Sequence, residues 1–385
     1  MLPRINKLPV NYVPLSPPYL TVDEEKVLSK VLRSGILALG PYLELFEKSF
    51  AKFIGTRFAV TTSSGTAGLH LALVALGIKT GDEVVTSPFS FVASANAILY
   101  CGAKVVFVDI DPVTFNIDPN KIERVITKNT KAILPIHVFG YPINYDNIMT
   151  IAKKYNLKVV EDACQSLGAV YNGKMVGNFG NMAIFAFYPN KQITTGEGGI
   201  VTTNSKKQHG LLKSLVNQGR NDDGQWLVHN KLGYNYRMDE ISAALGYIQM
   251  KKIKQILKSR KLAAKTYQEY LKNVNNVSTL AKDNEKSKRS WQTFIVMLDK
   301  SINRDKVMEI LISKKIQCKP YLPSIHLQPY WRKQFKYKEN TFPVSESVSK
   351  RSLALPLFTL MPKKMIERVC FELEKAIKRS RIIHR

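Results

Sequence analysis

The sequence predicts an α/β protein built on a mostly parallel sheet with helices on both faces. Two observations support this fold class. Short apolar segments alternate with helical stretches, which is typical of such sheets. With 385 residues, the chain is also too long for one ordinary core, so we expect two domains. The apolar segments lie at about 58 to 62, 83 to 87, 104 to 109, 132 to 138, 157 to 161 and 182 to 187.

The domain boundary is expected near residue 250. Residues 1–250 should form a large domain with an N-terminal arm, and residues 251–385 a smaller C-terminal α/β domain. The pattern changes after the amphipathic stretch 238–256, and a polar break follows at 281–290. Ligands of such sheets bind outside the carboxyl ends of the strands. The residues that follow each strand are therefore the candidates for a site.

The first strand leads through Ser64 into a helix that is rich in Ala and Leu. Backbone N–H groups stay free at a helix N-terminus, where the helix dipole also favours an anion. Gly65 and Thr66 are therefore candidates to hold a phosphate group. An ordinary N-cap explains the same residues, since Ser and Thr are favoured at caps with or without a ligand.

The second strand breaks at Pro88, and a helix follows. Phe91 stands at that junction, where an aromatic ring can stack on the ring of a ligand. Phe89 is less well placed because Phe91 opens the helix. Either phenylalanine also fits a plain apolar core.

The strand at 157–161 ends in Glu161 and Asp162, with Gln165 three residues later. A carboxylate at this place can pair with the ring nitrogen of pyridoxal phosphate, which works as an electron sink only while that nitrogen is protonated. Asp162 is the candidate for this role. Gln165 can bond the phenolic oxygen of the same ring without adding charge. Carboxylates at the end of a strand are also common as helix N-caps or metal ligands, which are the alternative explanations of these residues.

Lys191 lies between the last of these strands and the glycines at 196, 198 and 199. Glycines supply positive φ and close backbone approach where a chain turns under a ligand. A lysine held there is partly desolvated, which lowers its pKa and leaves more neutral amine to attack an aldehyde. Taken alone, Lys191 would be interpreted as a solvated loop lysine, because lysines are mostly exposed. Together with the other segments, it predicts a Schiff-base lysine for pyridoxal phosphate.

These segments together resemble the DegT/DnrJ/EryC1/StrS family of nucleotide-sugar aminotransferases, over nearly the whole chain. The resemblance implies the type I fold of pyridoxal phosphate enzymes and one active lysine, with no metal. The matching motifs are Ser64-Gly-Thr66, Phe107-Val-Asp-Ile-Asp111, His137-Val-Phe-Gly140, Glu161-Asp-Ala-Cys-Gln165, Lys191 to Gly199, Gly233 to Glu240 and Lys319 to Gln328.

The resemblance also implies a role for each matching residue. Lys191 would bind the cofactor covalently and then carry a proton, Asp162 would pair with the ring nitrogen, and Gln165 would face the ring oxygen. Phe91 would stack on the ring, while Gly65 and Thr66 would hold the phosphate. In the motif Gly-Tyr-Asn-Tyr-Arg, the asparagine is Asn235, which would reach the phosphate of a neighbouring subunit. A homodimer with a shared active site is implied.

The implied reaction moves an amino group, usually from L-glutamate, to a keto carbon of a nucleotide-linked sugar, for amino-sugar or surface polysaccharide biosynthesis. Tyr321 and His326 lie in a loop that approaches the cleft in this family, although His326 also fits a packed loop. Arg220 or Arg237 would meet a carboxylate or phosphate, and the sequence does not choose between them. Dehydration, transamination of a cyclitol, or a regulator that kept the fold are the alternatives.

Two positions depart from the family pattern. Many members carry a serine five residues before the lysine, where its hydroxyl binds the phosphate, and this chain has Ala186. Tyr188 stands where many relatives have histidine. A subgroup that performs dehydration replaces the lysine with histidine, and Lys191 argues against membership in it.

Charge is concentrated in the second domain. Residues 251–385 carry 32 Lys and Arg against 11 Asp and Glu, which is +21 of the total of +27. Attraction of a charged sugar nucleotide and contact with nucleic acid or an anionic membrane are two readings. The favoured interpretation is a third one, a Lys-rich solvated surface that reflects the codon bias or growth temperature of the host. The chain shows no zinc-finger spacing, aromatic ribonucleoprotein motif or continuous basic helix, and nucleic acid is therefore not an expected partner.

The four cysteines, Cys101, Cys164, Cys318 and Cys370, show no metal-ligand or redox spacing. A reduced, cytoplasmic protein is therefore expected. The first residues contain no apolar core of signal-peptide length, and no stretch is long enough to span a bilayer.

Overall fold

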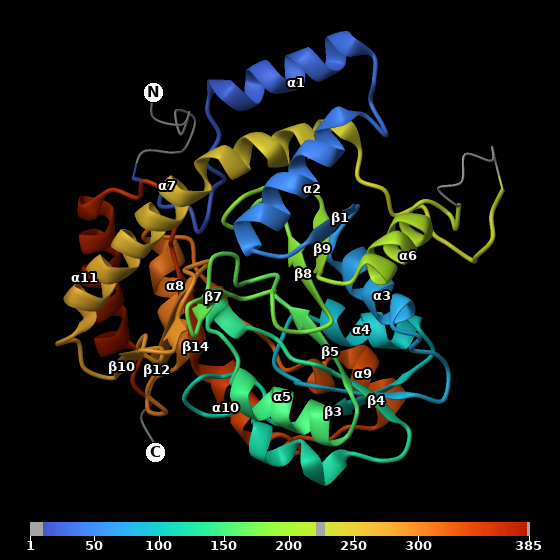
Figure 1. The fold of residues 1–385 in the computed structure, drawn as a ribbon. Coiled ribbons are helices and arrows are strands. Elements are labelled where there is room, and N and C mark those ends of the chain that lie inside the picture. The colour runs from blue at the N-terminus through green and yellow to red at the C-terminus, as the bar shows by residue number, and fades with distance from the viewer. Residues whose placement is uncertain (1–10, 221–227, 383–385) are drawn as a thin grey trace.

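The structure is a computed structural model that describes residues 11–220 and 228–382. A seven-stranded sheet in the order β1-β9-β8-β5-β4-β2-β3 forms its centre (Figure 1). Of these strands only β9 runs against the others, so the sheet is mostly parallel, as expected. The strands are β1 (Phe58–Thr62), β2 (Glu83–Thr86), β3 (Lys104–Phe107), β4 (Thr130–Leu134), β5 (Lys158–Asp162), β8 (Met182–Ala186) and β9 (Gly199–Thr203).

Helices cover both faces of this sheet because its strands are apolar on both sides. Successive residues of a strand point to opposite faces. In β2, Val84 lies in one core with α3, α4 and α6, whereas Val85 lies in the other core with α2, α5 and α7. These helices are α2 (Pro41–Ile54), α3 (Gly65–Ala75), α4 (Ala93–Tyr100), α5 (Tyr145–Lys154), α6 (Lys206–Val216) and α7 (Glu240–Leu271).

The N-terminal helix α1 (Val22–Ser34) lies beside α7, outside these layers (Figure 1). Thr21 caps it in a capping box with Glu24, and Gly35 ends it in the left-handed conformation. Lys252 of α7 reaches the Glu24 carboxylate at 2.7 Å. An ion pair between the buried Glu24 and the partly buried Lys252 therefore joins the two helices.

A second, four-stranded sheet in the order β10-β12-β14-β13 follows α7. Its core includes Tyr267 of α7 and Leu373 of α11, which lies beside α7 in Figure 1. The elements of this part are β10 (Val277–Thr279), β12 (Phe294–Leu298), α8 (Arg304–Ser313), β13 (Lys319–Pro320), α9 (Pro329–Phe335), α10 (Pro343–Arg351), β14 (Ser352–Leu355) and α11 (Lys363–Arg379). The boundary expected at residue 250 falls within α7, and this helix contributes side chains to the cores of both sheets.

Short elements connect the two sheets. A three-stranded sheet pairs β11 (Ser287–Lys288), β6 (Val170–Tyr171) and β7 (Lys174–Met175), so that residues before and after α7 lie side by side. The 3-10 turns are η1 (Pro119–Lys121), η2 (Glu123–Val125), η3 (Val138–Gly140) and η4 (Ile325–Leu327). In the described part of the chain, no helix is both long and apolar enough to cross a membrane.

Candidate active site

A cavity of about 640 Å³ opens where β1, β5 and β8 end. The carboxyl ends of these strands meet at one edge of the sheet, and residues far apart in the sequence therefore share one wall. The loop at 320–322 closes the cavity from the side of the second sheet. Among the residues singled out in the sequence, those that line the cavity are Gly65, Thr66, Phe91, Asp162, Gln165, Ala186, Tyr188, Lys191 and Tyr321.

Lys191 stands in a turn that follows β8, where its N–H donates to the Tyr188 carbonyl at 2.9 Å. Its side chain is half-buried at the cavity wall. Burial lowers the pKa of the Lys191 ammonium, against the opposing effect of Cys164 and Asp162. A larger fraction of neutral amine at a given pH follows from this direction.

The glycines after Lys191 let the chain return along the cavity. Gly196 and Gly198 have φ values of 82° and 153°, which L residues rarely adopt. Gly199 has an ordinary φ but lies against α3: a Cβ there would be 2.5 Å from the Ser64 carbonyl oxygen. β9 begins at this close approach, directly beside the start of α3.

The start of α3 presents backbone donors to the cavity. Ser64 caps the helix, since its hydroxyl accepts from Ala67 N–H at 3.1 Å and its carbonyl from Gly68 N–H at 3.0 Å. The N–H groups of Gly65 and Thr66 donate to no other residue in the part of the chain that the structure describes, and both residues line the cavity. An anion can therefore bind these two groups at the positive end of the helix dipole.

Asp162 ends β5 with its carboxylate at the cavity. Its Oδ1 accepts from Cys164 N–H at 3.1 Å, and its Oδ2 accepts from the Ser94 hydroxyl at 2.6 Å. Gln165 lies beside it, where its amide oxygen accepts from Phe139 N–H at 3.0 Å. This bond turns the amide oxygen toward Phe139 and leaves the NH₂ group as the donor that Gln165 can offer to a ligand.

Two aromatic residues complete the wall. Phe91 precedes α4 by two residues, and 64% of its surface is exposed although it is a large apolar side chain. Tyr321 accepts from the Asn190 amide at 3.1 Å. Burial raises the pKa of the Tyr321 phenol, so that it stays protonated near neutral pH.

The chain matches the model of the DegT/DnrJ/EryC1/StrS aminotransferase family over residues 18–374. It belongs to this family. GDP-perosamine synthase of Escherichia coli O157:H7 is 34% identical, over 94% of the chain and 97% of that protein. The spore coat polysaccharide biosynthesis protein SpsC of Bacillus subtilis is 35% identical, over 91% of the chain and 93% of that protein.

A solved structure agrees with these relatives. The crystal structure of DesV from S. venezuelae, in complex with a ketimine intermediate, matches with a TM-score of 0.88 and 31% identity. The match covers 94% of this chain and 95% of that chain. The protein is thus an aminotransferase of a family that acts on sugars, and the expected fold class is confirmed.

Both departures from the family pattern lie at the cavity of this aminotransferase. Ala186 ends β8 directly against the start of α3, since a Cβ on Gly65 would be 2.7 Å from the Ala186 Cβ. A side chain at 186 therefore faces the helix N-terminus. Tyr188 lines the cavity with 53% of its surface exposed.

The remaining residues singled out in the sequence lie outside this cavity. Asn235 is exposed in a bridge with Asn217, whose side-chain oxygen accepts from Arg237 at 3.0 Å. Arg220 pairs through its backbone with His229, next to the segment 221–227, which lies outside the described residues. The structure of one chain thus leaves the roles expected for Asn235, Arg220 and Arg237 as predictions.

His326 is fully buried, in the loop before α9. Its Nε2 lies 3.1 Å from the Glu346 carboxylate, and burial lowers the pKa of the imidazole despite this neighbour. The sequence left two interpretations of His326 open, a contact with substrate and a histidine packed inside its loop. Its buried surroundings agree better with the second.

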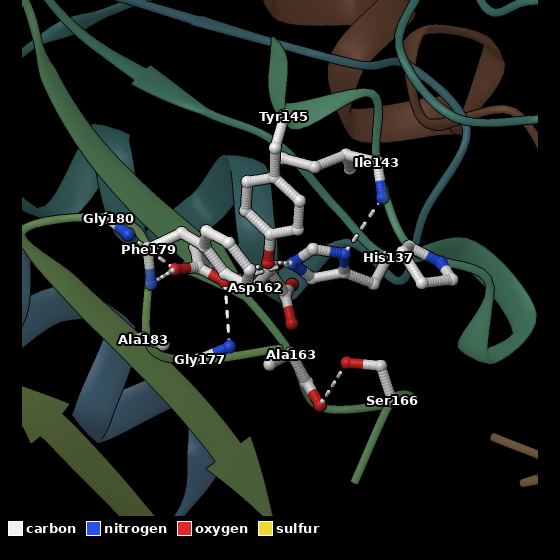
Figure 2. Close-up of polar contacts among 12 residues, drawn as sticks. His137, Ile143, Tyr145, Asp162, Ala163, Ser166, Gly177, Phe179, Gly180 and Ala183 are labelled. Atoms are coloured by element: carbon white, nitrogen blue, oxygen red, sulfur yellow. Dashed lines mark hydrogen bonds and ion pairs between the residues drawn. The ribbon is translucent and has the colours of Figure 1, made fainter. Parts of the chain in front are cut away.

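One buried network behind the cavity was missed by the sequence reasoning. Glu161 precedes Asp162 and points to the opposite face of β5, where it is fully buried. Figure 2 shows the donors that converge there from three segments. They are the Nε2 of His137 at 3.3 Å, the hydroxyl of Tyr145, and the N–H groups of Gly177, Phe179 and Gly180 at 2.9, 3.1 and 2.6 Å.

The charge of this network follows from its hydrogen bonds. The Nδ1 of His137 accepts from Ile143 N–H at 3.1 Å, and Nε2 therefore carries the ring proton. Burial alone would raise the pKa of Glu161, but the bonds from His137, Tyr145 and Gly180 outweigh it and lower that pKa. An ionised carboxylate thus ties β5, which carries Asp162, to the turn before β8, which leads to Lys191. Adjacent acids at the end of a buried strand were the available signal.

Proposed function

We propose that the protein is a pyridoxal phosphate-dependent aminotransferase that moves the amino group of L-glutamate to a keto carbon of a nucleotide-linked sugar. The observation that supports this most is the convergence of three groups on one cavity. These groups are a lysine with a lowered pKa, a carboxylate fixed on both oxygens, and a pair of free N–H groups at a helix start.

The residues around the cavity fit pyridoxal phosphate in their chemistry. Gly65 and Thr66 would hold its phosphate, Asp162 its ring nitrogen, Gln165 its phenolic oxygen, and Phe91 would cover its ring. The bound cofactor withdraws electrons from the substrate carbon that loses its proton, as long as the ring nitrogen is protonated. A carboxylate with two donors of its own is well suited to keep that nitrogen protonated without moving.

Lys191 would bind the cofactor through Nζ and then carry the proton. Its lowered pKa leaves neutral amine, which would add to the aldehyde of the cofactor. Once the amino donor had displaced it from the cofactor, the freed amine would take the proton from the donor's carbon. Proton transfer needs the amine to stay within reach of the substrate. The turn made by Lys191 N–H and the Tyr188 carbonyl places it at the cavity wall.

The anionic substrates pose a charge problem that one chain does not solve. Among the described lining residues, Lys191 is the single cation, against the carboxylates of Asp162 and Glu197. Glutamate and a sugar nucleotide both carry at least two negative charges. Cations from outside this lining would offset these charges, and Arg220 and Arg237 remain candidates, with Tyr321 as a neutral contact.

A homodimer with a shared site would supply groups from outside the lining. Asn235 and Arg237 lie on a segment that is hydrogen-bonded beside the start of α3. The bond runs from Ser63 N–H to the Tyr236 carbonyl at 2.7 Å. Two apolar side chains are also unusually exposed: Leu32 near the end of α1 at 60%, and Leu39 between α1 and α2 at 62%. Burial of such side chains in a partner would explain their exposure.

The test is an assay of purified protein with pyridoxal phosphate, L-glutamate and a panel of keto-sugar nucleotides and keto-cyclitols. Release of 2-oxoglutarate that depends on one keto-sugar nucleotide is the expected result. A visible absorbance band that borohydride abolishes would accompany it. Turnover of keto-cyclitols alone would contradict the sugar substrate, and the absence of both band and turnover would contradict the enzyme.

A further inference from the structure

Ser94 contacts the carboxylate on which the proposed chemistry depends. It lies in the first turn of α4 and is 1% exposed. Its hydroxyl oxygen is 2.6 Å from Asp162 Oδ2. This is the length of a hydrogen bond from a hydroxyl to a carboxylate, which is shorter and stronger than one between neutral groups.

The direction of the hydrogen bonds follows from counting protons. Ser94 has one hydroxyl hydrogen, and its oxygen lies near Asp162 at 2.6 Å, Ser90 at 3.0 Å and the Phe91 carbonyl at 3.2 Å. A carboxylate only accepts, so the hydrogen goes to the charged and closest partner, Asp162. The Ser90 hydroxyl must then donate to Ser94. A directed chain from Ser90 through Ser94 to Asp162 results, and such chains strengthen their members.

Ser94 decides how the carboxylate of Asp162 can turn. The torsion that rotates a carboxylate is broad and roughly two-fold, and side-chain geometry alone does not hold its plane. Cys164 N–H holds Oδ1 at 3.1 Å. With Ser94 on Oδ2, each oxygen has one donor from a different segment, the turn after β5 and the start of α4. Both oxygens keep a second lone pair for a ligand.

The same segment carries Phe91, which stands between the two serines. Ser90, Phe91 and Ser94 all line the cavity. Therefore one short stretch before and within α4 sets the side chain expected to cover the ring and the hydroxyl that holds Asp162. A shift of α4 would move both together.

We propose that Ser94 is a positioning residue that orients the Asp162 carboxylate toward the ring nitrogen of the cofactor, with Ser90 as its support. This inference rests on the proposed function. Loss of the Ser94 hydroxyl would leave Oδ2 without its protein donor and free to turn. Hydrogen bonds to charged groups are worth enough that cofactor affinity should fall about tenfold or more.

The experiment compares Ser94→Ala, Ser90→Ala and Ser166→Ala in the full-length protein. Ser166 is the matched control: it is fully buried, four residues from Asp162, and its hydroxyl donates to the Ala163 carbonyl at 3.2 Å (Figure 2). Pyridoxal phosphate is titrated into the apo-protein to determine its dissociation constant. The rate of the half-reaction with glutamate at saturating cofactor, the KM for glutamate and the urea midpoint are measured beside it.

Ser94→Ala should weaken cofactor binding about tenfold or more and slow the half-reaction while the KM for glutamate stays unchanged. Ser90→Ala should have a smaller effect in the same direction. Ser166→Ala should match wild type in both, even if its urea midpoint falls as far as that of Ser94→Ala. In an Asp162→Ala background, Ser94→Ala should add nothing to the loss of affinity, because its acceptor is gone.

Each failure has a distinct meaning. Ser94→Ala with the affinity and rate of Ser166→Ala, in a protein whose wild type binds pyridoxal phosphate, would overturn the inference alone. An undiminished effect of Ser94→Ala in the Asp162→Ala background would overturn it as well, since Ser94 would then act through another group. A wild type that binds no cofactor would overturn the proposed function and this inference with it.

Discussion

Replacing Glu161 by glutamine should strongly destabilise the protein, although the two side chains have the same shape. Oε2 of Glu161 accepts from Gly177 N–H and the Tyr145 hydroxyl, and Oε1 accepts from Phe179 N–H and Gly180 N–H. Glutamine has only one oxygen. Whichever way its amide is turned, the NH₂ group meets buried donors that lose their acceptor: two at the Oε1 position, or three at the Oε2 position, where His137 Nε2–H is the third.

The magnitude follows from that count. The His137 Nε2–H can turn to the Tyr145 oxygen at 3.2 Å, so it adds no third loss. Each buried donor without an acceptor costs about 1–3 kcal/mol, and Glu161→Gln should therefore lower the free energy of unfolding by about 2–6 kcal/mol. Urea unfolding of the apo-protein at pH 7, followed by circular dichroism, measures this difference.

Glu44→Gln is the control. Glu44 lies on α2 with 66% of its side chain exposed, in an ion pair with Lys48. Surface pairs of this kind contribute little, so its urea midpoint should match wild type. If Glu161→Gln lowered the free energy of unfolding by less than about 1 kcal/mol, the loss would be smaller than the cost of a single donor without an acceptor. This result would refute the hydrogen-bond count.

The effect should also depend on pH with a defined sign. The pKa of Glu161 is lowered from its ordinary value of 4.5, because its hydrogen bonds outweigh the effect of burial. Its contribution to stability is therefore complete above pH 4.5 and is lost as the pH falls through the folded-state pKa. The difference between wild type and Glu161→Gln should narrow below pH 4.5. A constant difference there would mean that Glu161 is not ionised in the folded protein.

The other predictions concern the proposed chemistry. Lys191→Ala should abolish turnover with an unchanged circular dichroism spectrum, and multiple turnovers near the wild-type rate would contradict its role. Asp162→Asn should retain much of the cofactor binding but lose most of the rate in single turnovers with glutamate; an equal rate would exclude it as the partner of the ring nitrogen. Ala186→Ser should slow cofactor loss on dilution, by about 0.5–1.5 kcal/mol of affinity, and faster or unchanged loss would mean that this side chain does not face the phosphate. Mixed dimers of Lys191→Ala and Asn235→Ala should recover activity that neither parent has, because one site collects both lesions; verified heterodimers without recovery would rule out the shared site.

The fold class was predictable because its signals are local. Each parallel strand is a short apolar run, and the observed bounds differ from the expected ones by a few residues, as at β4 (Thr130–Leu134) against 132 to 138. β9 was not predicted. This strand begins at Gly199, against the backbone of Ser64, and pairs with both β1 and β8. Its partners in β1 lie more than a hundred positions earlier in the chain.

The candidate site divides in the same way. Asp162 ends a parallel strand, and Gly65 and Lys191 each follow one. Because parallel strands end at one edge of a sheet, the sequence alone allowed these separate motifs to be joined into one site. Ser94 carried no comparable signal. Which face of α4 meets β5 depends on how the helix packs on the sheet, and a serine one turn further along would look the same in the sequence.

The sequence by itself therefore determined the six parallel strands of the first sheet, the family, and the residue types that can perform transamination. Only the tertiary structure decided which side of β5 receives Glu161, that His326 is enclosed beside Glu346, and that Ser94 reaches Asp162. The physical reason is one of range. Periodicity, capping and turn preferences act between neighbours in the chain, whereas hydrogen bonds between elements depend on the rotation and distance at which those elements pack.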